Sequence, residues 1–387
     1  MSWAAIVTAA WSQDGTAPAA SGGRLSPENL DRAIAMNLEF LLNNQKDAGN
    51  FTYEYDFSLK RESQEDNSVR QAGALWGLTL MHRRTPSERS EAAIRKGLAF
   101  FERLSTVREG RRFIRYPGEE EGKPGTVALV ALAIIDFSRS PSGNDPVLRQ
   151  RLNEYLDFLV SLRTPSGLFH GLYRLEDGSG FDEPSPYADG ETLLAFAKAA
   201  KYLGLEKYKD IAVASAEAMH AEHVTAALKR HPDSDRTKGF YQWGSMSFYE
   251  MSTVGWPNGE VLNRRVIDLA HWMIDVHRVL DRGRNTAYAF EGIAHAWELA
   301  RISGDRPAMA KFESVIQRGL ARLLSWQVGN PSQNAYLTYH DASRDPRARG
   351  GVMNAAADPV LRIDVTQHQA HATAAIRDFL YRADRTP

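Results

Sequence analysis

Polar clusters and apolar segments alternate six times along the chain. The clusters carry Asp, Asn, Gln, Ser or Thr beside Gly or Pro, and they begin near residues 66, 122, 187, 242, 285 and 362. Each is followed by a run of mostly small and apolar residues, as in 126–137 and 192–200. A helix that is apolar all round must be buried on every side. The sequence therefore predicts six inner helices.

Segments of a second kind separate these runs. Their apolar residues recur at helical spacing and leave one charged face, and they span roughly 27–45, 86–104, 145–163, 206–222, 259–281 and 305–327. Ser26, Thr85 and Asp305 each precede a proline at the start of such a segment, which is typical of a helix N-terminus. These segments predict outer helices.

Twelve helices in alternating outer and inner order predict an all-α fold, an (α/α)6 toroid of six helical hairpins over residues 25–387. An open α-solenoid of stacked hairpins is the alternative. A solenoid should leave a polar concave face, whereas all six inner helices are apolar. The pattern favours the closed ring.

Composition narrows the class of protein. The 387 residues are 43% apolar and 25% charged, which is ordinary for a soluble globular protein. A net charge of −1 gives no electrostatic signature of nucleic-acid binding, and no segment has the roughly 18 apolar residues that indicate a membrane span. Because cysteine is absent, disulfides, thiol nucleophiles and Cys-ligated zinc are excluded.

The N-terminus differs from the rest of the chain. A short apolar run over residues 3–11 is followed by a stretch rich in Pro, Ala, Gly and Ser up to residue 23. We interpret residues 1–24 as a flexible segment resembling a signal-peptide remnant, which favours a periplasmic or secreted protein. The positive residues that open a signal peptide are missing, so a frayed tail on a cytoplasmic protein is the alternative.

The inner helices of a ring run parallel, so the polar clusters should meet at one mouth. Carboxylates gather there: Asp66, Asp189, Glu291 and Asp364 are the candidate catalytic acids, and Asp56 and Glu191 stand in the same openings. A pair of carboxylates can divide the work of acid and base in glycosidic cleavage. The alternative is that each one caps a helix. Glu291 is the least cap-like, because it falls inside its helix among apolar residues.

Two histidines accompany these acids. His295 follows Glu291 by four residues and His368 follows Asp364 by four, so each pair shares one helix face. A carboxylate one turn away fixes an imidazole's tautomer and raises its basicity, and both histidines are candidate catalytic residues. A hydrogen-bonded core histidine is the alternative. We expect no metal site and no cofactor, because an Ala- and Thr-rich helix interior offers little room for open coordination.

Aromatic and basic side chains surround the same openings. Tyrosine and tryptophan beside a mouth can stack on a sugar ring and hydrogen-bond at its edge, while arginine can hold a carboxylate. The candidate substrate-binding residues are Tyr53, Tyr55, Arg70, Tyr187, Trp243, Tyr288 and Arg362. The alternatives are core packing for the aromatic rings and salt bridges to Asp66 or Asp364 for the arginines.

One motif carries a family resemblance. The segment Phe40 to Phe51 reads as helix, Gln, turn, Gly and aromatic residue, and residues 323–327 repeat its first half. This resembles the α/α-toroid superfamily, which includes six-hairpin glycosidases, polysaccharide lyases and sugar epimerases. The chain lacks the Asp-x-Asp-Asp motif of squalene-type cyclases, and without cysteine it cannot build the zinc sites of prenyltransferases. His295 and His368 look like the histidine pair of sugar 2-epimerases.

The resemblance implies a carbohydrate-active enzyme, a glycoside hydrolase or polysaccharide lyase that cleaves an oligo- or polysaccharide with acids at the toroid mouth. Two alternatives stay open: a sugar epimerase or isomerase that uses the histidine pair, and a carbohydrate-binding scaffold without chemistry. In each case the expected partner is a saccharide. The oligomeric state is left open.

Overall fold

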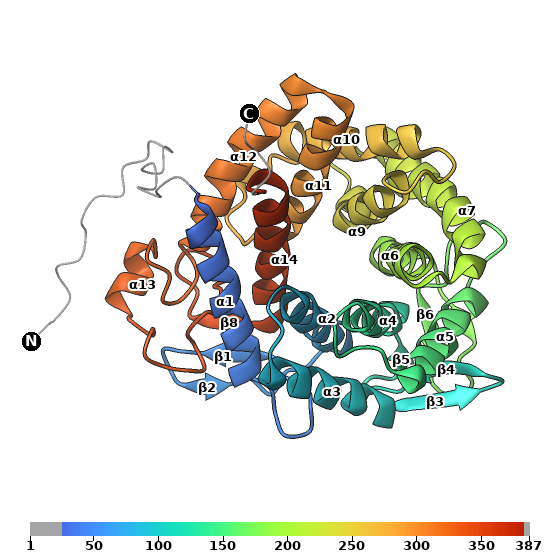
Figure 1. The fold of residues 1–387 in the computed structure, drawn as a ribbon, viewed down its shortest axis with the longest axis horizontal. Helices are drawn as coiled ribbons and strands as arrows, with labels where there is room; N and C mark the ends of the chain where they lie inside the picture. The colour runs from blue at the N-terminus through green and yellow to red at the C-terminus, as the bar shows by residue number, and fades with distance from the viewer. Residues whose placement is uncertain (1–24, 383–387) are drawn as a thin grey trace, which may run out of the picture.

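The computed structural model describes residues 25–382. In this part of the chain, six inner helices stand inside a ring of outer helices (Figure 1). The fold is the predicted (α/α)6 toroid. The signal-like segment expected over residues 1–24 lies outside the described residues. Among residues 25–382 no helix combines the length and the apolar character that crossing a membrane requires.

The inner helices each pack on the next one, and the last packs on the first, so the ring is closed. They are α2 (Ser68–Arg84), α4 (Pro124–Ser138), α6 (Pro186–Leu203), α9 (Asp235–Ser252), α11 (Ala287–Ser303) and α14 (Ile363–Leu380). Almost every residue of α4 is buried, as expected for a helix surrounded by protein on all sides.

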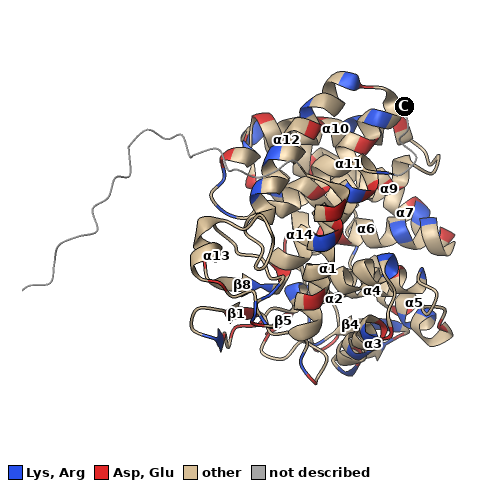
Figure 2. Cartoon of the chain, turned by 60° about the vertical axis from the view of Figure 1, so that its left-hand side comes forward, with Lys and Arg blue, Asp and Glu red and all other residues tan. Residues whose placement is uncertain are grey.

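The outer helices present one apolar face to the inner ring and their charged face to solvent. They are α1 (Pro27–Asn43), α3 (Glu88–Arg103), α5 (Pro146–Ser161), α7 (Lys209–His220), α10 (Gly259–Asp275) and α12 (Arg306–Leu324). A 3-10 turn (Glu206–Tyr208) precedes α7, and a π-helix (Ala221–Ala226) and α8 (Ala227–Arg230) extend it. Figure 2 shows charges of both signs interspersed over the outer helices in view.

The two ends of the toroid differ. All strands lie in connections that run from an outer helix to the next inner helix, so they gather at the end where the inner helices begin. They form three small antiparallel sheets: β2 (Arg61–Glu62), β1 (Glu54–Asp56) and β8 (Val360–Arg362); β3 (Ser105–Arg108) and β4 (Arg111–Ile114); and β5 (Glu121–Gly122), β6 (Leu172–Arg174) and β7 (Gly180–Phe181). A short helix, α13 (Ala335–Tyr339), lies in the last long connection. The mouth is therefore the end of the toroid that carries these sheets and connections.

The expected start of one inner helix was wrong. The sequence analysis placed the opening of this helix near residue 242, but α9 begins at Asp235, with Ser234 as its extended N-cap residue. The polar run from Asp235 supplies an ordinary helix start, so Gln242 and Trp243 lie two turns inside the helix. The outer helix expected over 259–281 ends at Asp275, and a 3-10 turn (Val279–Asp281) follows it.

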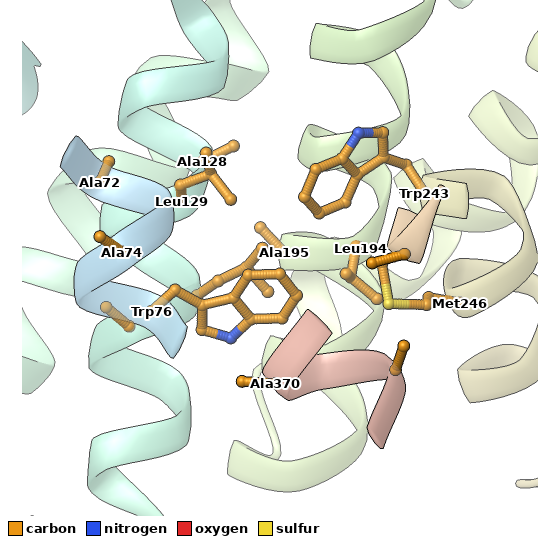
Figure 3. Close-up of a cluster of buried hydrophobic side chains, with 14 of the residues drawn as sticks. Ala72, Ala74, Trp76, Ala128, Leu129, Leu194, Ala195, Trp243, Met246 and Ala370 are labelled. Carbon is orange, nitrogen blue, oxygen red and sulfur yellow. The ribbon is translucent and has the colours of Figure 1, made fainter. Parts of the chain in front are cut away.

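The middle of the ring is filled rather than open. Side chains from α2, α6, α9 and α14 meet there, among them Trp76, Leu194, Trp243, Met246 and Ala370 (Figure 3). The ring centroids of Trp76 and Trp243 are 5.8 Å apart. We call this layer the waist. It separates the mouth from the opposite, rear end of the toroid.

A buried charge network stands on the rear side of the waist. Asp136 of α4 is fully buried, and it accepts a hydrogen bond of 2.8 Å from the indole N–H of Trp76. It also forms ion pairs with Lys198 of α6 and, at 2.9 Å, with Arg139. Burial acts to raise the pKa of Asp136, but the positive charge of Lys198, with those of Arg83 and Arg139, lowers it well below its usual range. The network ties α2, α4 and α6 together.

Replacing Asp136 with Asn should therefore destabilise the toroid. The variant keeps the side-chain volume but removes the carboxylate that contacts the buried Lys198, and breaking a buried ion pair typically costs about 3–5 kcal/mol. Urea unfolding followed by far-UV circular dichroism measures the change. The control is Glu39→Gln, which removes an exposed ion pair with Arg89 and should cost less than about 1 kcal/mol. Equal losses in both variants would contradict this assignment.

Candidate active site

Two adjacent cavities open at the mouth. The main cavity has a volume of about 570 Å³ and lies at the N-terminal ends of α2, α4, α6 and α14. The side cavity has about 230 Å³ and lies towards α9 and α11. Tyr187, Gln242, Asp364 and His368 line both. The two cavities are therefore neighbours, and together they take in most of the predicted mouth.

Asp364 stands between two arginines at this junction. Strand β1 pairs with β8 and sets Arg362 opposite Glu54, just before α14 begins. The Arg362 guanidinium contacts Asp364 at 3.0 and 2.5 Å, and Nε of Arg70 lies 3.1 Å from Oδ2 of Asp364. Burial acts to raise the pKa of Asp364, but the two arginines lower it below its usual value. Asp364 is therefore an ionised carboxylate at neutral pH.

Glu191 of α6 has the opposite environment. Its side chain is buried and lines the main cavity, and it makes no hydrogen bond or ion pair with residues 25–382. A Cβ on Gly125 of α4 would lie 2.1 Å from Oε2 of Glu191, so the carboxyl group fits only because residue 125 is glycine. Burial raises the pKa of Glu191 to about 8. Its carboxyl group is therefore protonated at neutral pH.

The third feature is a charged pair between the last two inner helices. Nδ1 of His368 lies 2.7 Å from Oε1 of Glu291. Burial acts to lower the pKa of His368, but the negative charge of Glu291 raises it above the usual value. Burial acts to raise the pKa of Glu291, and the charge of His368 outweighs it and lowers that pKa. The second oxygen, Oε2, has no hydrogen-bond partner among the described residues, and Nδ1 of His371 lies 3.7 Å from it.

Of the candidate residues, seven line the mouth cavities. These are Arg70, Tyr187, Trp243, Tyr288, Arg362, Asp364 and His368. Glu291 lines neither of the two cavities, but it forms a hydrogen bond with His368, which lines both. Tyr187 is the most exposed aromatic residue of this group, with half of its surface accessible, and it stands where the two cavities meet.

Two candidate acids, Asp189 and Asp66, line neither cavity, and their carboxylates accept hydrogen bonds from neighbouring segments instead. The carboxylate of Asp189 accepts a hydrogen bond of 2.9 Å from the backbone N–H of Phe169 and lies 2.6 Å from Nε2 of His223. Gln71 holds the backbone N–H of Phe51 at the equivalent point of the first hairpin. Asp66 accepts hydrogen bonds from Gln71 and from the hydroxyl group of Tyr116. The catalytic roles of both acids stay predictions.

Three other candidates also lie away from these cavities. His295 donates from Nδ1 to the backbone carbonyl of Glu291 at 2.7 Å and lines a separate cavity of about 220 Å³ at the rear. It is therefore not brought together with His368. Tyr53 is buried beneath the guanidinium group of Arg70, and Tyr55 donates to Asp345 at 2.7 Å.

The sequence analysis did not select Glu191 as a catalytic residue, although it placed this acid at the mouth. The signal was available, because Glu191 is followed by the apolar run 192–200 in the same way that Glu291 is surrounded by apolar residues. Lys238, Gln242, Asn285 and Asn354 also line the site and were missed. Within residues 25–382 no group of three or more His, Asp or Glu side chains is placed to hold a metal ion.

No protein-family model matches the sequence, and no curated protein is significantly similar to it. Solved structures are similar in fold. A sugar epimerase from a ruminal bacterium superposes with a TM-score of 0.65 at 10% identity, covering 91% of this chain and 98% of the other. An α-mannanase of glycoside hydrolase family 76 from Bacteroides thetaiotaomicron gives 0.60 at 11%, covering 90% and 95%. An unsaturated glucuronyl hydrolase from a Bacillus species gives 0.60 at 14%, covering 92% and 100%.

These similarities define the fold class of the protein. The protein has the six-hairpin α/α-toroid fold shared by these enzymes, which confirms the resemblance inferred from the sequence. At 10–14% identity the similarity shows the fold, and the chemistry has to be argued from the site.

The burial of Glu191 makes stability depend on pH. Burial raises the pKa of its carboxyl group from 4.5 to about 8, so between these values the folded protein keeps a proton that the unfolded chain has released. The retained proton of Glu191 makes its full contribution to the free energy of unfolding below about pH 4.5. The free energy of unfolding should therefore fall as pH rises from there towards 8. Thermal unfolding between pH 5 and 9 measures the slope.

Glu191→Gln is the matched variant, because it keeps the volume and cannot ionise. Its free energy of unfolding should decline less than that of the wild-type protein over the same pH range. Identical slopes would show that Glu191 is ionised in the folded protein.

Proposed function

We propose that this protein is a glycoside hydrolase acting on an oligo- or polysaccharide. The observation that carries the proposal is the presence of two carboxyl groups with opposite pKa shifts in one cavity. Burial keeps Glu191 protonated, while Arg70 and Arg362 keep Asp364 ionised. Titratable groups whose environments separate their pKa values mark the acid and its ionised partner.

In this mechanism Glu191 donates its proton to the glycosidic oxygen as the bond between that oxygen and the anomeric carbon breaks. Positive charge then develops on the sugar ring, and the carboxylate of Asp364 stabilises it. Water adds to the anomeric carbon, and its released proton restores the acid. The stereochemistry of the product distinguishes direct attack by water from a covalent intermediate.

The walls of the cavity suit a sugar ring. The half-exposed Tyr187 offers an aromatic face on which a sugar ring can stack, and the buried Trp243 lines the cavity beside it. Polar side chains can hydrogen-bond with sugar hydroxyl groups at the same site, among them Asn67, Gln242 and Gln367. Two of the three similar structures described above are of enzymes named as a mannanase and a glucuronyl hydrolase, which supports a hydrolase acting on carbohydrate.

A sugar epimerase or isomerase is the second candidate. It is favoured by the pair between His368 and Glu291, which places an imidazole of raised pKa at the junction of the two cavities, and by the similarity to a sugar epimerase. In this reaction His368 would move a proton to and from a sugar carbon. The two candidates make opposite predictions for Glu191 and His368.

Glu191→Gln should lower kcat for glycoside hydrolysis by about 10²-fold or more, because the amide cannot donate the proton. In the wild-type protein kcat/KM should fall as pH rises through about 8, where Glu191 ionises. Release of reducing sugar from a panel of oligosaccharides, followed by proton NMR, measures both. The control is Glu176→Gln, an exposed acid that lines neither cavity, and its activity should be unchanged.

The same panel tests the alternative. Epimerisation or isomerisation of a free sugar in deuterium oxide, with uptake of deuterium that is lost in His368→Asn and kept in Glu191→Gln, would replace the hydrolase proposal. Saccharide binding without any reaction would favour a scaffold role.

A further inference from the structure

The side cavity has its own chemical character. Tyr187 and Tyr288 line it together with Lys238 of α9 and the amide side chains of Asn285 and Asn354. It adjoins the main cavity, and Asp364 and His368 line both. A saccharide bound in the main cavity can therefore extend a ring substituent into it.

Lys238 is the distinctive residue. Its side chain is half-buried, and within residues 25–382 it forms no ion pair and no side-chain hydrogen bond. Asp235 lies one turn earlier on α9 but not within ion-pair distance. The ammonium group of Lys238 is reached by solvent and lies in the wall of a cavity, so it is available to pair with an anionic ligand.

The other charges of the side cavity are already matched. Arg362 is held by Asp364, and His368 is held by Glu291. Arg70, which the sequence analysis also assigned to substrate binding, contacts the same Asp364. A second carboxylate, that of Glu54, lies 3.9 Å from Nε of Arg362, so the two arginines face two acids. The positive charge left over is the single charge of Lys238. It fits a group with one negative charge, since a dianion would also face the carboxylate of Asp364.

We propose that the side cavity is a subsite for a singly charged anionic substituent of the saccharide, the carboxylate of a uronic acid residue, and that Lys238 is its charged partner. The inference rests on the proposed function, because it takes the sugar ring to be bound in the main cavity. The amide of Asn354 supplies a second donor, and Tyr187 and Tyr288 contact the ring that carries the carboxylate.

Calorimetric titration of the full chain tests this subsite without turnover. The probes are trisaccharides of galacturonate, glucuronate and mannuronate, with the neutral trisaccharide of the same linkage beside each one. At least one uronate should bind the wild-type protein about tenfold or more tightly than its neutral counterpart, which is the strength of one hydrogen bond to a charged group.

Lys238→Met should remove this preference and leave the affinity for the neutral trisaccharide unchanged. Lys238→Arg keeps the charge and should retain most of the preference. The control is Lys229→Met, which removes an exposed lysine from α8 and should bind like the wild-type protein. Thermal unfolding of each variant shows whether it is folded.

Three results would overturn the proposal: equal binding of uronate and neutral trisaccharides by the wild-type protein, an equal loss of both in Lys238→Met, or no binding of any uronate. An otherwise neutral trisaccharide that carries one sulfate ester is a further probe. If it binds more tightly than the uronates, the proposed ligand group of the subsite becomes a sulfate ester instead of a carboxylate. Binding that follows this pattern without hydrolysis would contradict the proposed reaction and leave the subsite standing.

Discussion

Burial of six apolar helices is the constraint on which this structure depends. An inner helix such as α4, which has hardly any exposed residue, needs protein on every side, and a closed ring with an outer layer and a filled waist provides it. Closure makes the inner helices parallel, so that their N-termini and the long connections before them meet at one end. The fold thereby concentrates the polar residues of six distant segments at a single mouth.

The mouth then gives two carboxyl groups opposite properties. Both lie near the start of an inner helix. Asp364 has two arginines, one brought by strand pairing and one by the neighbouring helix α2, and it stays ionised. Glu191 faces the bare backbone of Gly125 and forms no ion pair with residues 25–382, so burial decides its protonation. The difference arises from the partners of each acid: Asp364 contacts Arg362, two residues before it, and Arg70 of α2, whereas Glu191 has no such partner among the described residues.

The periodic pattern was enough to predict the toroid and most helix limits, because burial of a helix face is encoded by spacing along the chain. The start of α9 was missed because the polar residues from Asp235 read as a loop. The site was harder to predict. An acid at a helix opening can bind a loop, as Asp189 binds the Phe169 backbone, or face a cavity, as Glu191 does. That choice, like the unpaired state of Lys238, depends on side chains from other hairpins.

The way in which the ring closes has a consequence for biosynthesis. Helix α14 carries Asp364 and His368, and it packs on α1, α2 and α11. It is the last of the twelve toroid helices to leave the ribosome, so until then the nascent toroid is an open arc whose apolar edges on α2 and α11 are uncovered. Such surfaces are prone to aggregation and to chaperone binding. The polypeptide therefore acquires its site and covers the last apolar surfaces of the toroid in the same event, after the other eleven helices have been made.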